Sequence, residues 1–158
     1  MHNHFTMVKP CMVKLQFFKE NTMKKLLLAS FIFCSLNATE VTYDKSTSLL
    51  WQDNGDSGHR NRMFTYQEAQ SYCENLVLGE YSNFRIPTIF ELQTLIDYRY
   101  HNPAMLRGFK NVLADEYWTS TPYAYRSDSY WTIDFKKGTT EPAGDRYDKH
   151  LRCVQRIQ

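Results

Sequence analysis

Residues 83–92 read NFRIPTIFEL, and residues 151–154 read LRCV. In the first stretch, Pro87 favours an extended backbone at the residue before it. Thr88 follows, and Glu91 stands three residues further on, which is the pattern of a capping box at the start of a helix. In the second stretch, Cys153 lies in a short run typical of a strand. An extended segment, a helix start and a strand cysteine together predict an α+β domain.

A second capping box predicts a second helix earlier in the chain. Thr65 and Glu68 begin it, and Gly79 is expected to end it. Apolar residues at helical spacing define the buried face of each helix. In the earlier helix they are Tyr66, Ala69, Tyr72, Cys73 and Leu76, and in the later one Ile89, Leu92, Leu95 and Ile96. Cys73 is therefore expected to point into the core.

The remainder of the domain is predicted to be strands joined by turns. Residues 129–135 alternate, with Trp131, Ile133 and Phe135 on one face. Residues 136–138 form a hairpin turn, after which the chain pairs back. The other expected strands are 41–43, 49–51, 83–86, 116–120, 139–142 and 151–156, of which the last closes the sheet with Cys153 on its inner face.

Residues 23–38 are typical of a secretory signal peptide, with a basic start, a short apolar core and a small residue at the end. The apolar core is shorter than the roughly 20 residues that span a bilayer. Residues 1–22 are interpreted as a start codon assigned too early or as a disordered segment; a tail before an uncleaved signal anchor is the alternative. Residues 39–158 then form a single domain, periplasmic or secreted, with no stable membrane insertion after cleavage.

Removal of the leader changes the charge of the protein. The leader holds five of the 19 basic residues and one of the 17 acidic ones, which leaves 14 bases and 16 acids in residues 39–158. A nearly neutral domain has no general field that attracts nucleic acid or anionic lipid. Neither is therefore expected as a partner.

The same cleavage removes Cys11 and Cys34 and leaves Cys73 and Cys153. Two cysteines in an exported chain most simply form one disulfide. A strand cysteine that faces a helix cysteine can meet the geometry such a bond requires. The sequence therefore predicts that the first helix is tied to the last strand.

Seven motifs occur in this order: LLWQ (49–52), TYQEA (65–69), YCENL (72–76), GEYSNFRIPT (79–88), EL (91–92), YWTSTP (117–122) and RCV (152–154). The series resembles the Lcl C-terminal domain family, named for the end domain of a bacterial collagen-like adhesin. The resemblance implies a C-type-lectin-like fold, with two helices packed on small antiparallel sheets. The RIPT and RCV pieces are also similar to those of formylglycine-generating enzymes. Those enzymes depend on a catalytic cysteine pair besides any structural bridge. Residues 39–158 have no cysteine beyond the expected bridge, so that activity is not carried over.

The sequence contains no catalytic set, and no cofactor or metal is expected. Glu141 and Pro142 are followed by Ala143 rather than by an amide, which departs from the calcium-binding motifs of C-type lectins. The loop acids that could still hold calcium are Asp128, Asp134, Glu141, Asp145 and Asp148. The histidines at 59, 101 and 150 are scattered, without metal spacing. Arg85 is expected to be structural, bonding carbonyls or a carboxylate such as Glu91. Trp118 and Trp131 are expected in the core.

Two surfaces are candidates for binding. The first is a tyrosine-rich loop, whose composition is typical of recognition surfaces; its candidate residues are Tyr123, Tyr125, Arg126, Asp128 and Tyr130. The second is a basic patch for sulfated glycans; its candidate residues are Arg146, Lys149, His150 and Arg152, with Lys136 and Lys137 nearby.

These observations favour an exported, non-enzymatic binding module for a glycan or protein at the bacterial envelope, with a role in adhesion. A periplasmic structural or assembly protein with one protein partner is the alternative. An enzyme on the same scaffold is the third hypothesis, because a fold does not fix a function. The chain has no collagen-like tract, so the resemblance does not extend to trimer formation.

Overall fold

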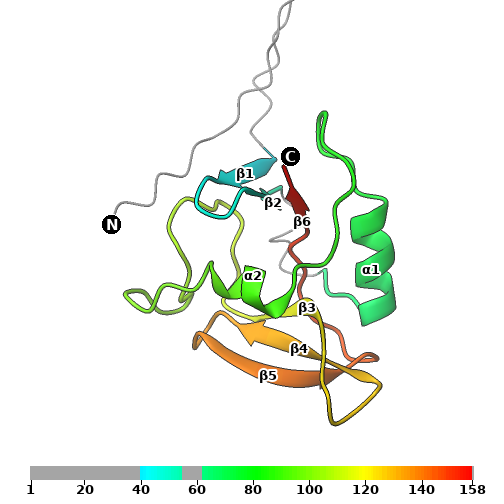
Figure 1. The fold of residues 1–158 in the computed structure, drawn as a ribbon. Coiled ribbons are helices and arrows are strands. Elements are labelled where there is room, and N and C mark those ends of the chain that lie inside the picture. Colours follow the sequence, from blue (N-terminus) through cyan, green and yellow to red (C-terminus); the bar gives the residue numbers. More distant parts are fainter. Residues whose placement is uncertain (1–39, 55–61, 158) are drawn as a thin grey trace, which may run out of the picture.

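The computed structural model describes residues 40–54 and 62–157. The expected signal peptide, residues 1–22 and His59 lie outside the described residues. Two helices pack with two small antiparallel sheets, which confirms the predicted α+β class (Figure 1). The elements are β1 (Val41–Asp44), β2 (Leu49–Gln52), α1 (Tyr66–Glu74), α2 (Ile89–Gln93), β3 (Glu116–Pro122), β4 (Ser129–Asp134), β5 (Thr139–Gly144) and β6 (Val154–Arg156).

Both helices begin at the predicted capping boxes. The Thr65 hydroxyl accepts the N–H of Glu68, and the Glu68 carboxylate accepts the N–H of Thr65. Thr88 and Glu91 form the same pair of bonds at α2. Four backbone N–H groups at a helix start have no partner within the helix, so such caps satisfy donors that would otherwise be unpaired.

The predicted end of α1 at Gly79 is wrong. The helix ends at Glu74, because Asn75 at the C-cap has a φ of −95° and a ψ of 0°, and the N–H of Leu76 then donates to the carbonyl of Cys73, three residues back, at 3.1 Å. Gly79 instead adopts a φ of +62° in a separate turn, where the backbones of Leu78 and Tyr81 pair. Its positive φ, rather than helix termination, explains a glycine there.

The first sheet has the order β1-β2-β6. β1 and β2, which correspond to the expected strands 41–43 and 49–51, form an antiparallel hairpin. The last strand is shorter than predicted and joins this sheet rather than the 129–144 hairpin, with Val154 opposite Trp51. Arg85 also forms a single bridge with Val154. The predicted 83–86 strand is reduced to this bridge, because Asn83 has a φ of +62°, which breaks the extended run.

The second sheet has the order β3-β4-β5. The predicted turn at residues 136–138 joins β4 to β5, with Asp134 opposite Thr139. β3 runs through Pro122, two residues beyond the predicted end. Proline cannot donate to a neighbouring strand, but β3 is an edge strand, where its missing N–H is tolerated.

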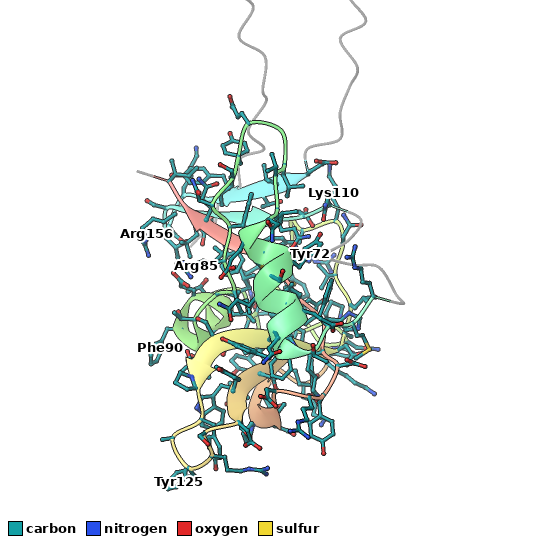
Figure 2. All side chains as sticks on the ribbon, turned by 90° about the vertical axis from the view of Figure 1, so that its right-hand side faces the viewer. Tyr72, Arg85, Phe90, Lys110, Tyr125 and Arg156 are labelled. Atoms are coloured by element: carbon teal, nitrogen blue, oxygen red, sulfur yellow. A yellow bond between two sulfur atoms is a disulfide. The ribbon has the colours of Figure 1, made fainter. Side chains whose placement is uncertain are left out.

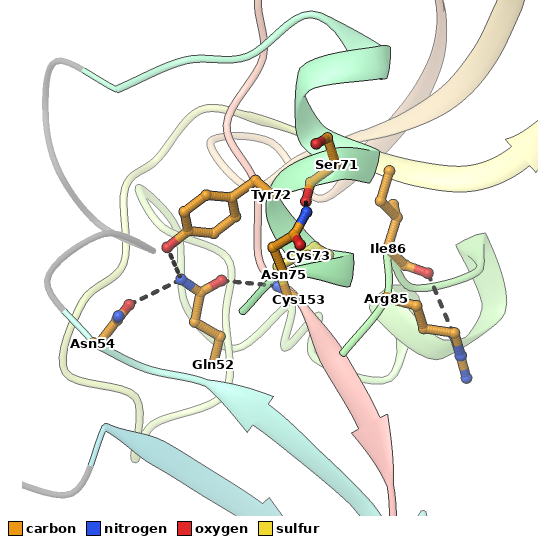
Figure 3. Close-up of a disulfide and its surroundings, with 9 residues drawn as sticks. All are labelled: Gln52, Asn54, Ser71, Tyr72, Cys73, Asn75, Arg85, Ile86 and Cys153. Atoms are coloured by element: carbon orange, nitrogen blue, oxygen red, sulfur yellow. Dashed lines mark hydrogen bonds between the residues drawn. A yellow bond between two sulfur atoms is a disulfide. The ribbon is translucent and has the colours of Figure 1, made fainter. Parts of the chain in front are cut away.

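The disulfide between Cys73 and Cys153 confirms the prediction that α1 is tied to the last strand region. The Gln52 side chain lies beside it (Figure 3) and donates to Asn54 and to the Tyr72 hydroxyl. Its carbonyl accepts the N–H of Cys153 at 3.0 Å. The disulfide and this amide therefore fix the same point where α1, β2 and the chain end meet.

The core has two apolar clusters. One surrounds the disulfide and includes Trp118, and the other packs α2 against Trp51 and Tyr117. Trp118 is fully buried as predicted, and its indole N–H donates to the carbonyl of Phe64 at 2.7 Å. The prediction that Trp131 is a core residue is wrong: Trp131 is only partly buried. It is the third residue of β4 and packs against Tyr123 instead of the core clusters.

Candidate functional site

Three rings form a surface feature that we call the aromatic cluster: Tyr123, Tyr125 and Trp131. The Tyr123 ring packs edge-on against Trp131, with centroids 5.1 Å apart and planes at 88°. Tyr125 lies 5.5 Å from Tyr123 and is 86% exposed. Edge-to-face pairs of this kind are a preferred aromatic geometry. The cluster therefore presents one exposed ring supported by two others.

The loop that carries the cluster is closed by its own backbone. Tyr123 donates to the carbonyl of Ser129 at 2.9 Å, and Ser129 donates to that of Arg126 at 3.2 Å. The exposed side chains of Arg126 and Asp128 form an ion pair at 3.5 Å. Such exposed pairs contribute little to stability. Their charges thus remain accessible beside the aromatic rings.

Tyr130 does not join this surface. Its ring stacks on Tyr66, with centroids 3.4 Å apart and planes at 9°, and Tyr66 packs edge-on against Trp118. Partial burial, together with Tyr130, raises the pKa of the Tyr66 hydroxyl to about 12. Tyr130 is therefore a partly buried neighbour of the core.

The predicted basic patch is not formed. His150 is 3% exposed and lies 3.3 Å from a carboxylate oxygen of Asp115, and Arg152 is fully buried. Lys149 is mostly buried and forms an ion pair with Glu116. Arg146 alone of the four is exposed. The sequence-based prediction erred because charged residues next to a buried cysteine strand were taken as surface residues.

Arg146 nevertheless lies at the same end of the molecule as the tyrosine loop. The N–H of Asp145, its neighbour, donates to the carbonyl of Asp128 at 2.8 Å. Ser129 and Gly144 face each other where β4 and β5 meet at this end. The backbone next to Arg146 therefore lies beside Asp128 of the tyrosine loop, while Lys149 pairs with Glu116.

A cavity of about 490 Å³ lies in the connection between α2 and β3, and sequence reasoning missed it. We call it the 99–112 cavity after the residues that bound its wall. Its lining includes Arg99, Arg107 and Lys110, with Tyr100 and Phe109 between them. The only signal in the sequence is this alternation of bases and aromatic rings, in a segment without helix or strand periodicity.

Within residues 40–54 and 62–157, no three His, Cys, Asp or Glu side chains lie close enough to hold a metal ion. Of the acids considered for calcium, Asp134 lies 3.4 Å from the Lys137 ammonium, and its carboxylate accepts the N–H of Lys136. The same part of the chain contains no helix long and apolar enough to cross a membrane.

A family model also matches the sequence of this domain. The model of the Lcl C-terminal domain matches residues 40–155. The chain belongs to this family. No curated protein matches it significantly. The further likeness to C-type lectins and to formylglycine-generating enzymes stays a prediction.

Proposed function

We propose that this protein is an exported, non-enzymatic binding module that recognises a glycan or protein at the bacterial envelope through the aromatic cluster. The observation that carries the proposal is Tyr125, a large ring that is 86% exposed and yet supported from behind by Tyr123. Rings with few rotatable bonds give large contact areas at low entropic cost. A sugar ring stacks well on such a face.

The charged pair beside the rings supports recognition of a polar ligand. Arg126 and Asp128 are about two-thirds exposed, so a ligand can replace their ion pair with contacts of its own. A guanidinium offers several fixed donors, and a carboxylate offers acceptors, which match the hydroxyl groups of a sugar or a peptide backbone. Rings and charges together favour a ligand that is amphipathic.

The disulfide supports the exported location, because such bonds persist in oxidising compartments and are rare in the cytosol. Export is tested by the mass of the N-terminal peptide in the periplasmic and culture fractions. The proposal expects cleavage near residue 39. An intact leader in the cytoplasmic fraction alone would contradict this part of the proposal.

The binding experiment compares Tyr125→Ala with Phe90→Ala on a panel of neutral and sulfated glycans, with calcium, chelator or reductant. Phe90 is the matched control, since it is 76% exposed and lies away from Tyr125 (Figure 2). Loss of an exposed stacking ring should weaken binding by about 1–3 kcal/mol, or roughly five- to 150-fold.

The Phe90→Ala control should bind as well as the wild type. Equal binding by both variants would exclude the aromatic cluster as the binding surface. If no glycan of the panel bound and a pull-down recovered a single envelope protein, the result would instead support the periplasmic assembly role.

A further inference from the structure

The 99–112 cavity carries positive charge without a matching acid. Arg99 is compensated by Asp97, whose carboxylate accepts its Nη2 at 2.6 Å. Arg107 and Lys110 are exposed, and neither side chain has a carboxylate partner within residues 40–54 and 62–157. No acidic side chain of the described chain lines the cavity. The lining of the cavity thus includes two cations, Arg107 and Lys110, that have no carboxylate partner in the described part of the chain.

Arg107 is oriented by an aromatic ring. Its guanidinium carbon lies 4.4 Å from the centroid of the Tyr100 ring. Stacking uses the face of the guanidinium and leaves the N–H groups at its edge for a ligand. A carboxylate fits this edge with two parallel hydrogen bonds.

The backbone around the cavity is held at several points. Ala104 donates to the carbonyl of Phe135 at 2.6 Å, and Leu106 donates to that of Leu95 at 2.8 Å. At the other end, the buried carboxylate of Asp53 accepts the backbone N–H of Lys110 at 3.0 Å. Fixed walls lower the entropic cost of binding.

The rest of the lining is apolar. Met105 is buried against the α2 cluster, and the Phe109 ring lies 4.9 Å from the guanidinium carbon of Arg152. Leu106 and Val112 add further apolar surface. A bare inorganic anion would leave these walls in contact with water, and a neutral ligand would leave the cations unpaired.

We propose that the 99–112 cavity binds an apolar carboxylate, a ligand with one anionic head and one apolar body. Arg107 and Lys110 hold the carboxylate, and Phe109 and Met105 contact the body. The ligand is either a free organic acid or the C-terminal residue of a peptide. This site is separate from the aromatic cluster: Figure 2 shows Lys110 and Tyr125 at opposite ends of the molecule.

The test uses N-acetyl-L-phenylalanine as the probe on the purified protein at low salt, by ligand-observed NMR and calorimetry. Its amide keeps the apolar body without the charge, and acetate keeps the charge without the body. We expect a Kd of about 0.1–1 mM for the acid, typical of a ligand of this size. The amide and acetate should bind at least about tenfold more weakly.

Two charge variants locate the site. Arg107→Gln and Lys110→Gln should each weaken binding of the acid by about tenfold. Both residues are exposed, so the melting temperature should not change. Lys45→Gln is the matched control, because Lys45 is an exposed base in the β1–β2 turn, at the end of that hairpin away from Asp53. It should bind as the wild type does.

A tetrapeptide that ends in phenylalanine distinguishes the two sources. Tighter binding of the peptide than of N-acetyl-L-phenylalanine would identify a chain terminus, and the reverse order would identify a free organic acid. Three results would overturn the site: no binding up to about 10 mM, equal binding of acid and amide, or binding that neither charge variant weakens.

Discussion

Arg152 carries its charge in the interior of the domain. It is fully buried, and its Nη1 donates to the carbonyl of Gln52 at 2.6 Å and to Asp53 at 3.3 Å. Nη2 donates to the carbonyl of Asn111. A buried charge is tolerated only when it is paired and hydrogen-bonded in this way. One side chain therefore joins β2, the 99–112 segment and the chain end.

Asp53→Asn is expected to destabilise the protein by about 3–5 kcal/mol, because it leaves the buried Arg152 charge without its counter-charge. It also replaces an acceptor oxygen by a donor in a site where Thr42, Lys110 and Asn111 all donate. Urea unfolding followed by tryptophan fluorescence measures the change. Asp128→Asn is the matched control in an exposed pair and should change stability by less than about 1 kcal/mol. A similar effect of both variants would contradict the structural role of Arg152.

At the residue scale, sequence patterns were reliable for local contacts and failed for the burial of basic residues near the chain end. The pairing of Arg85 with Glu91 was predicted correctly, because Arg85 shortly precedes the capping box to which Glu91 belongs. Arg152 was predicted at the surface, since an arginine is rarely buried and its partner Asp53 lies 99 residues away. No local pattern reveals a partner at that distance.

Among the elements, α2 depends most on its start. It has only five residues, too few for a stable isolated helix, so its cap and its packing must hold it. Glu91 accepts the N–H of Thr88 and two bonds from Arg85, at 2.6 and 2.7 Å. Arg156 adds a charge at 3.7 Å. The helix is thus fixed to the bridge between residue 85 and β6.

The pH dependence of this contact follows from the pKa of Glu91. Burial alone raises it, but the bonds from Arg85 and Thr88 outweigh burial, and the net pKa is lowered. A lowered carboxyl pKa stabilises the fold above the unfolded value of about 4.3, and this contribution is lost as the pH falls through the lowered pKa of the folded state. Glu91→Gln should therefore cost about 1 kcal/mol at pH 7 and less at pH 3.

Unfolding midpoints at both pH values check this prediction. Arg85→Gln should show the same loss, and in the Glu91→Gln background it should add little, because the pair acts as one unit. A cost of Glu91→Gln that is equal at pH 3 and pH 7 would contradict the assigned ion pair.

The elements also show why the 99–112 cavity could not be predicted. The capping boxes and the 129–144 hairpin follow from local rules, and both were predicted correctly. The segment between α2 and β3 has neither period, and its shape comes from distant partners such as Asp53 and Phe135. The aromatic cluster was predicted in part: Tyr123 and Tyr125 were candidate binding residues, whereas Trp131 was assigned to the core.

At the scale of the whole molecule, the two sheets meet at the chain end. Residues 150–156 contact both sheets. His150 forms a bridge with Tyr117 of β3 in the second sheet, and Val154 of β6 pairs with Trp51 of β2 in the first sheet. Cys153 lies between these contacts and carries the bond to α1. The disulfide therefore ties a helix to the segment that already joins both sheets.

Replacing both cysteines, Cys73→Ala with Cys153→Ala, should lower the free energy of unfolding by about 2–5 kcal/mol. The bond closes a loop of 80 residues, which in the chain-entropy model is worth about 4–5 kcal/mol through the unfolded state. Tryptophan fluorescence in urea measures the loss, and peptide mass mapping without reductant must show the bond in the wild type. Reductant should shift the wild type toward the variant and leave the variant unchanged. The variant should remain folded at 25 °C, because Gln52 and the Arg152 contacts still fix the chain end. If complete reduction left the unfolding free energy of the wild type unchanged, these contacts alone would suffice to stabilise the chain end, and the prediction would be wrong.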